Sequence, residues 1–246
     1  MLKYFDAHDH LQNYATADEA AAALAAAEKA GVERMLCCGT SPDDWAAVLE
    51  LAGRYPAVTP AFGLHPWHSA EDGWLERLEE FLRRVPSCVG EIGLDGLNGR
   101  PGQEEDLKGQ LQLARRMGRP AVLHCVKSWG RMQELLKGAL PPRFMFHSYS
   151  GSAELVKVFA ELGGYFSFGG EIMDPRRERL RAALAAAPRE RLLFETESPE
   201  PDAPGWRAGP AGVAEVVAFA ADLLGVPAAE LAALSVANGR EFLKGL

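Results

Sequence analysis

Short apolar runs alternate with longer segments of helical periodicity from one end of the chain to the other. The apolar runs are nearly continuous, which is typical of strands in a parallel sheet that helices cover on its faces. The first predicted strand lies within the sequence Lys3 to His10. Seven further strands are predicted at 33–39, 57–64, 88–94, 120–125, 143–147, 164–168 and 191–196.

Helical segments fill the intervals between these strands. Thr16 and Glu19 form a capping box at the start of the first helix, and Gly31 provides its end. The second helix is expected to begin at Ser41 and Pro42, because proline suits the first turn of a helix. Later helices are expected near 71–84, 103–118, 128–138, 152–162, 175–187, 210–224 and 227–243.

Eight strands, each followed by a helix, predict an α/β fold of the (β/α)8 TIM-barrel type, with parallel strands and an extra C-terminal helix. The length of 246 residues suits such a barrel as one domain, so we expect a single TIM-barrel hydrolase domain over 1–246. An open doubly wound sheet is the alternative. No glycine-rich GxGxxG sequence follows the first strand, which leaves a dinucleotide-binding fold with little support.

The composition narrows the class of partner. A formal net charge of −8 argues against a broad electrostatic grip on nucleic acid, although bound metal ions can supply a local positive charge. No apolar run approaches the ~18 residues of a membrane span, and the first residues do not resemble a signal peptide. We therefore expect a cytoplasmic protein with no membrane association and with reduced core cysteines at Cys37, Cys38, Cys88 and Cys125.

Histidines gather at the ends of the predicted strands. His8 and His10 lie on one face if their segment is a strand, and Asp6 is expected to share that face. An isolated HxH pair is often only a solvated strand end. In a TIM barrel, however, catalytic groups come from the C-terminal ends of several strands, and such ends hold all six histidines: His8, His10, His65, His68, His124 and His147. The group predicts a metal site.

Carboxylates complete this set. Glu91 lies between glycines at the end of the fourth strand, and Glu195 and Glu197 fall on one side of the eighth if the strand continues through them. Imidazole and carboxylate ligands suit Zn²⁺ or Mn²⁺, and Mg²⁺ becomes less expected as histidines accumulate. Such a site supports hydrolysis, because a bound divalent ion lowers the pKa of water and polarises the scissile group.

Several local sequences resemble one family. An HxH on strand one, a Glu on strand four, single histidines on strands five and six and an acid on strand eight are similar to the amidohydrolase superfamily. Within it, the chain resembles the TatD-type metal-dependent deoxyribonucleases. The stretches that carry the resemblance are Phe5–Leu11, Gly63–Pro66, Gly90–Asp95, Phe146–Gly151, Gly164–Gly170 and Glu195–Pro199.

The resemblance implies two divalent metal ions, Zn, Mn or Mg. His8, His10 and Glu91 would bind the first ion, and Glu91 would bridge to a second ion held by His124 and His147. The implied substrate is DNA, at its ends or in single strands, cleaved at phosphodiester bonds by a metal-activated water.

The resemblance also implies roles for three further residues. Glu197 would contact the first metal and the attacking water as ligand and general base. His65 would approach the substrate phosphate or the leaving group, and Glu195 would orient its neighbours. The family usually has aspartate where this chain has Glu197, whose extra methylene pushes the carboxylate further into the site.

Two departures concern substrate contacts. Val126 stands where the family usually has an arginine, with Lys127 as a differently directed replacement, and the segment 204–210 departs from an RxxxNxP-like pattern. These departures keep two other functions open: hydrolysis of a small ester, lactone or amide, and a weakly active metal-binding homologue. The oligomeric state also stays open.

Some rim residues have two readings. Trp67, Tyr149 and Trp206 are expected in rim loops, either to stack on a base or to pack within the loop. A basic run on the seventh helix is expected to form a solvated face that counters Glu178, with a track for DNA as the alternative; it consists of Arg176, Arg177, Arg179 and Arg181.

Overall fold

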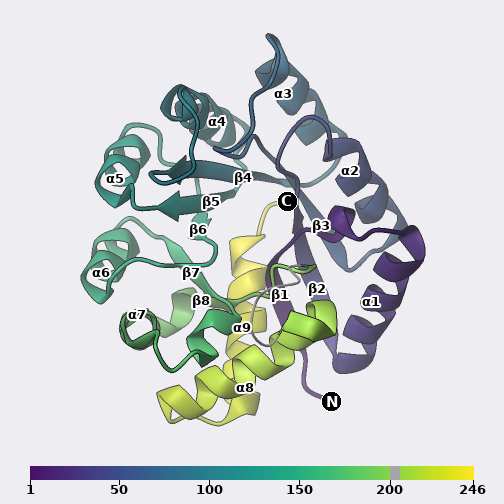
Figure 1. Ribbon diagram of the computed structural model, residues 1–246, viewed down its shortest axis with the longest axis vertical. Helices are drawn as coiled ribbons and strands as arrows, with labels where there is room; N and C mark the ends of the chain where they lie inside the picture. The colour runs from purple at the N-terminus through teal and green to yellow at the C-terminus, as the bar shows by residue number, and fades with distance from the viewer. Residues whose placement is uncertain (200–205) are drawn as a thin grey trace.

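Eight parallel strands follow one another in sequence order around a barrel (Figure 1). The computed structural model describes residues 1–199 and 206–246. The strands are β1 (Tyr4–Asp9), β2 (Val32–Cys38), β3 (Val58–Phe62), β4 (Cys88–Asp95), β5 (Ala121–Val126), β6 (Phe144–Phe146), β7 (Tyr165–Phe168) and β8 (Leu192–Phe194). Helices follow the strands and form an outer ring, so the predicted (β/α)8 barrel is confirmed.

The helices of the outer ring are α1 (Ala17–Ala30), α2 (Trp45–Arg54), α3 (Trp74–Arg84), α4 (Gln103–Met117), α5 (Trp129–Gly138), α6 (Ala153–Glu161), α7 (Glu178–Ala186) and α8 (Val213–Leu224). The predicted extra C-terminal helix is α9 (Ala228–Phe242). Short 3-10 turns include η2 (Gly170–Met173) after β7 and η4 (Trp206–Gly212) before α8. In the part of the chain that is described, no single helix is long and apolar enough to cross a membrane, and only the bent pair 209–224 with 228–242 meets that test when combined.

Some predicted boundaries were wrong. The second helix begins at Trp45 instead of Ser41, because the Asp44 carboxylate accepts hydrogen bonds from the Thr40 N–H (2.8 Å) and Ser41 N–H (3.3 Å) and holds them in a turn. Helices α3 and α7 also begin three residues later than expected. Strand β8 ends at Phe194, short of the residues that carry its predicted acids.

The barrel closes between β1 and β8 through the segment just after β8. His10 N–H donates to the Ser198 carbonyl (2.7 Å), and Glu197 N–H donates to the His8 carbonyl (2.9 Å). Further down this seam between β1 and the segment after β8, a side chain makes the connection in place of the backbone. The Asp6 carboxylate accepts hydrogen bonds from the Thr196 N–H (3.0 Å) and from the Thr196 hydroxyl. The end of β8 is thereby fixed to the HxH segment.

The interior of the barrel is apolar at its lower end. Phe5, Leu36, Val122 and Met145 form part of a buried cluster inside the strands, and Phe242 of α9 joins it. Figure 1 shows α9 near the centre of the molecule, whereas the other helices lie outside the strands. Closure of this end by α9 leaves the upper end, at the C-termini of the strands, free for polar groups.

Candidate metal centre

Two irregularities in strand pairing aim the candidate ligands into the barrel. In β1, Asp6 pairs with Met35 and Asp9 with Cys37, so two residues of β1, Ala7 and His8, lie opposite one residue of β2. Such a bulge shifts the side-chain alternation by one position. His8 and His10 therefore face inward. The expectation that Asp6 shares their face was wrong, because Asp6 is in register with Met35, a residue of the outer core layer.

Strand β4 has the same device. Val89 pairs with Ala121 and Ile92 with Leu123, so Gly90 and Glu91 together lie opposite Val122. A β-carbon at position 90 would meet the Val122 β-carbon at 2.6 Å, so the extra residue needs glycine beside it. The bulge turns the carboxylate of Glu91 inward.

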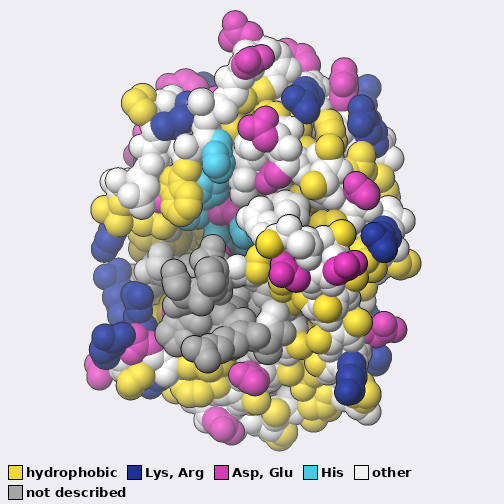
Figure 2. Space-filling model, turned by 45° about the vertical axis from the view of Figure 1, so that its right-hand side comes forward, with side chains coloured by type: hydrophobic (Ala, Val, Ile, Leu, Met, Phe, Trp, Pro, Cys, Tyr) yellow, Lys and Arg dark blue, Asp and Glu magenta, His cyan; other side chains and the backbone are white. Residues whose placement is uncertain are grey.

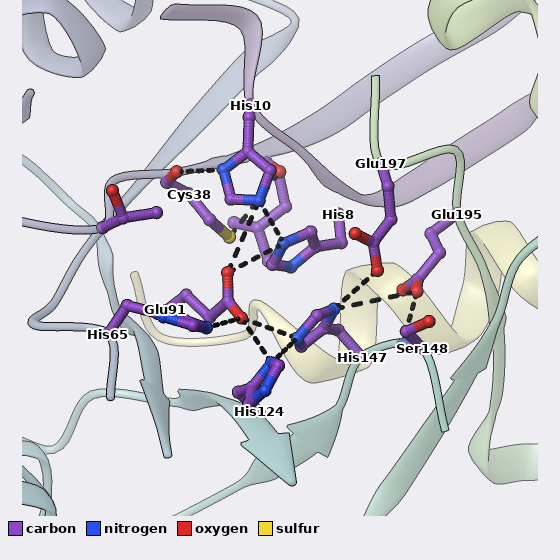
Figure 3. A network of polar contacts seen from close by, with 12 residues as sticks. His8, His10, Cys38, His65, Glu91, His124, His147, Ser148, Glu195 and Glu197 are labelled. Carbon is purple, nitrogen blue, oxygen red and sulfur yellow. Dashed lines mark hydrogen bonds and ion pairs between the residues drawn. The ribbon is translucent and has the colours of Figure 1, made fainter. Parts of the chain in front are cut away.

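Five imidazoles surround the Glu91 carboxylate, and the two oxygens divide them (Figure 3). Oε2 lies 3.4 Å from Nε2 of both His8 and His10. Oε1 lies 3.1 Å from His65 Nε2, 3.0 Å from His124 Nδ1 and 2.7 Å from His147 Nε2. The side chains thus form two donor groups on either side of one buried carboxylate.

For His10 and His124, the partner of the outward ring nitrogen shows which nitrogen has a free lone pair. His10 Nδ1 lies 2.8 Å from the Cys38 carbonyl, which can only accept, so Nδ1 carries the hydrogen and Nε2 presents its lone pair. His124 Nε2 lies 3.4 Å from the Asp95 carboxylate, which leaves His124 Nδ1 facing Glu91. Both imidazoles have the orientation that a metal ligand requires.

Two further histidines of this group, His8 and His147, lie against each other. The rings of His8 and His147 stack with centroids 4.0 Å apart, and burial lowers the pKa of His8 to about 4. Burial also opposes charge on His147, but the carboxylates of Glu91 and Glu197 outweigh it and raise the pKa of this imidazole well above its usual value. In this protein a proton on His147 therefore provides a positive charge between two carboxylates.

Glu197 reaches the centre from an unusual backbone conformation. Its φ of 57° is in the left-handed region, which is uncommon for a residue other than glycine. Its Oε1 lies 2.9 Å from His147 Nδ1, and its carboxylate also groups with His8 and His10 within 4.8 Å. The predicted alternation along β8 is not the reason, because the strand has already ended at Phe194.

Glu195 supports the centre from behind. Its carboxylate accepts a hydrogen bond from the N–H of Ser148, the residue after His147, and lies 4.0 Å from His147 Nδ1. Burial, and next the charge of Glu197, raise the pKa of Glu195 well above its usual value. These contacts place Glu195 beside His147 and Ser148, and its orienting role stays a prediction.

His65 differs from the other imidazoles. Its Nδ1 accepts a hydrogen bond from the Trp67 backbone N–H (3.2 Å), so the neutral ring carries its hydrogen on Nε2. That hydrogen points at Glu91 Oε1. His65 is therefore arranged as a hydrogen-bond donor to Glu91, and its implied contact with the substrate stays a prediction.

The sequence did not single out Asp95 as a site residue. Its Oδ2 accepts from the Trp67 indole N–H (2.7 Å) and lies 3.4 Å from His124 Nε2. Its Oδ1 accepts from the N–H groups of Leu97 and Asn98. The signal was available, because an apolar strand that ends on an acid at the barrel rim places that acid beside the next strand.

Other rim predictions have different outcomes. His68 is exposed and does not join the five imidazoles. Trp67 is 54% exposed, whereas Tyr149 is buried and packs against Phe146 and Phe166. Residues 204 and 205 and the side chains of 206–208, Trp206 among them, lie outside the described part of the chain. Figure 2 shows the histidines in a hollow of the surface, with acidic atoms between them.

The donor set fits divalent metal ions. Buried carboxylates and imidazoles converge here, and the Nε2 atoms of His8 and His10 approach each other to 3.1 Å. Such an arrangement needs positive charge between its members, as Zn²⁺ or Mn²⁺ provides. Comparison with known families agrees, since the model described as "TatD related DNase" matches residues 5–244. The chain belongs to the TatD related DNase family.

Relatives within the TatD family cover most of the chain. The "uncharacterized metal-dependent hydrolase YjjV" of Escherichia coli K12 is 32% identical over 244 residues, 94% of each chain. A crystal structure of YjjV superposes with a TM-score of 0.89 and covers 99% of this chain and 98% of that one. The "3'-5' ssDNA/RNA exonuclease TatD" of Edwardsiella piscicida is 37% identical over 188 residues, 72% of each chain. The chain is thus a metal-dependent TatD-family hydrolase, and the predicted enzyme class is confirmed.

Proposed function

We infer that this TatD-family hydrolase uses two divalent metal ions to remove nucleotides from the ends of single-stranded DNA or RNA. The observation that carries the two-metal proposal is the division of the Glu91 carboxylate: Oε2 faces His8 and His10, and Oε1 faces His124 and His147. A carboxylate that offers one oxygen to each of two donor groups is suited to bridge two ions.

Each proposed ligand has a defined side. His8, His10 and Glu197 would hold the first ion with Glu91 Oε2, while His124 and His147 would hold the second with Oε1. Zn²⁺ and Mn²⁺ suit this set, and Mg²⁺ is the third candidate. Ions held there would lower the pKa of an attacking water and polarise the scissile phosphate.

Three side chains would handle the substrate and its protons. Burial raises the pKa of Glu197, but the positive charge of His147 outweighs it and lowers this pKa to about 2. The carboxylate is therefore ionised at neutral pH and would accept the proton of the attacking water. His65 Nε2–H would donate to a phosphate oxygen or to the leaving oxygen. Glu195 would keep the His147–Ser148 turn in position.

The substrate class rests on the relatives. Several of them carry the name 3'-5' ssDNA/RNA exonuclease TatD, and one of these covers 87% of this chain. Four unpaired buried cysteines are compatible with a reducing, cytoplasmic location. The whole chain, 1–246, would act as one catalytic domain.

Metal content and DNA cleavage measured on the same preparation test this function. We expect about two metals per chain by elemental analysis and progressive loss of 3' nucleotides from a single-stranded oligonucleotide. His8→Ala should abolish cleavage, whereas His68→Ala, which changes an exposed histidine of the same rim, should retain it. Two bound metals with turnover of a carboxyl ester, lactone or amide but no phosphodiester cleavage would favour the small-ester alternative instead.

A further inference from the structure

A cavity of about 520 Å³ opens on the rim beside the metal centre, between the ends of β5, β6 and β7 and the start of α7. We call it the rim pocket. Lys127 and three arginines form its charged side, Arg176, Arg177 and Arg179. Among the residues that the structure describes, Glu171 is the one acidic residue of its lining. In a chain with a net charge of −8, four cations at one cavity are a local reversal of charge.

The segment that carries the arginines is fixed to the barrel. Arg181 donates to the backbone carbonyls of Ile172 (2.8 Å) and Met173 (3.2 Å), which ties α7 to η2. Arg176 forms an ion pair with Asp174 at 2.9 Å. Arg177 and Arg179 also line the pocket and are exposed. Among the described residues, neither side chain takes part in these hydrogen bonds or in this ion pair.

The lining also includes apolar residues, which we call the apolar wall: Val126, Trp129, Tyr149 and Phe168. Val126 and Trp129 are half-buried, whereas Tyr149 and Phe168 are buried, and the Tyr149 hydroxyl donates a hydrogen bond to the Ser152 carbonyl (3.0 Å). A pocket lined by cations and by a half-buried tryptophan suits a ligand with an anionic end and a flat or apolar body. A nucleotide unit has this form, since arginine pairs with phosphate and aromatic side chains stack on bases. The volume is within the range of small-ligand pockets.

Ser148 connects the rim pocket to the metal centre. It follows the candidate ligand His147, its N–H donates to Glu195, and its hydroxyl lies 3.3 Å from Glu171 Oε1. A single-stranded nucleic acid with one phosphate at the metal centre can therefore place its neighbouring nucleotide in the rim pocket.

We propose that the rim pocket is a nucleotide subsite: it binds the phosphate of the unit next to the scissile bond through Arg177, Arg179 and Lys127, and the body of that unit on the apolar wall. This rests on the proposed function, because it assigns a second contact to the same substrate. For the basic run at the start of α7, whose Arg176, Arg177 and Arg179 are exposed, the proposal favours a contact with nucleic acid over a face that is only solvated.

The test compares dinucleotides that differ by one phosphate. Wild-type protein should hydrolyse a dinucleotide with an extra terminal phosphate, at its 5' or its 3' end, with a lower KM than the same dinucleotide without it. In the double variant Arg177→Ala/Arg179→Ala the ratio of these two KM values should fall about tenfold. The matched control is Arg115→Ala/Arg189→Ala, which removes two exposed arginines at the opposite end of the barrel and should keep the wild-type ratio.

A binding measurement separates this proposal from the proposed function. Calorimetric titration of a deoxynucleoside monophosphate into protein with excess chelator should give about tenfold weaker binding to the double variant than to the control. If no diester is hydrolysed but this difference is found, the proposed function fails and the subsite stands. Equal binding by all three proteins, or an unchanged KM ratio in the double variant, would overturn the subsite.

Discussion

At the scale of single residues, hydrogen-bond partners outside the centre decide what each histidine does inside it. The Cys38 carbonyl accepts a hydrogen bond from His10, and the Asp95 carboxylate accepts one from His124. The other ring nitrogen of each histidine then directs its lone pair at Glu91. The Trp67 N–H instead donates to Nδ1 of His65, which leaves the hydrogen of this ring on Nε2, toward Glu91. His10 and His124 therefore present lone pairs to the carboxylate, whereas His65 presents an N–H.

His65→Ala should lower kcat about a hundredfold while the metal content stays at the wild-type value, because the variant loses a proton donor and not a ligand. Elemental analysis and steady-state kinetics on the same sample measure both. His68→Ala serves as the control. Loss of one metal per chain in the His65 variant would show that the ring is a ligand after all.

Glu197→Gln should reduce activity by about a hundredfold or more, since the amide cannot accept the proton of water. Glu197→Asp should reduce it about tenfold, because a carboxylate one methylene shorter withdraws from His147, now at 2.9 Å. Kinetics with a single-stranded oligonucleotide measure both variants. A gain of activity in the aspartate variant would instead mean that the longer side chain impairs the native enzyme.

At the scale of elements, the bulges in β1 and β4 and the close approach of β4 to β5 build the site. Glycines permit that approach. A β-carbon at position 93 would lie 2.0 Å from the His124 carbonyl oxygen, so the strand that carries Glu91 can pack beside the strand that carries His124 only without a side chain there. This explains why an acid at the end of an apolar strand is flanked by glycines.

Gly93→Ala should reduce the free energy of unfolding by about 3 kcal/mol and lower metal content, because β4 must move away from β5. Gly53→Ala is the matched control: position 53 lies in α2 with no atom within 4 Å of a new β-carbon, so the change should be neutral or stabilising by up to about 1 kcal/mol. Urea unfolding of both variants gives the comparison, and equal stability would contradict the packing argument.

At the scale of the whole molecule, the imidazoles lie at one end of an acidic barrel, and the apolar cluster that α9 closes lies at the other end. In the metal-free protein, the raised pKa of His147 adds stability below its unfolded value of 6.5, and this contribution is lost as the pH rises through the folded value. A bound metal ion would supply the positive charge that the proton on His147 supplies in the metal-free protein.

Binding of Zn²⁺ or Mn²⁺ at pH 7 should therefore release about one proton per chain from His147 and raise the melting temperature. Calorimetric titration in two buffers of different ionisation enthalpy gives the proton count, and thermal unfolding with and without chelator gives the stability. Metal affinity should weaken as the pH falls. Proton uptake on binding would contradict the assignment of a protonated His147.

The sequence alone determined the order of elements and the chemistry of the site. Continuous apolar runs and capping signals such as Thr16 with Glu19 are local, and Thr16 does accept from the Glu19 N–H (3.2 Å). The residue types His and Glu at strand ends indicated a metal centre because the fold brings those ends to one rim.

Tertiary structure decided how those residues face one another. Strict alternation along β1 would put His8 on the side opposite Ala7, and only the extra residue in the pairing with β2 brings both inward. Glu197 likewise owes its position to a left-handed backbone held by the His8 carbonyl across the seam. Pairing register and seam contacts join residues far apart in sequence, so no local pattern could specify them.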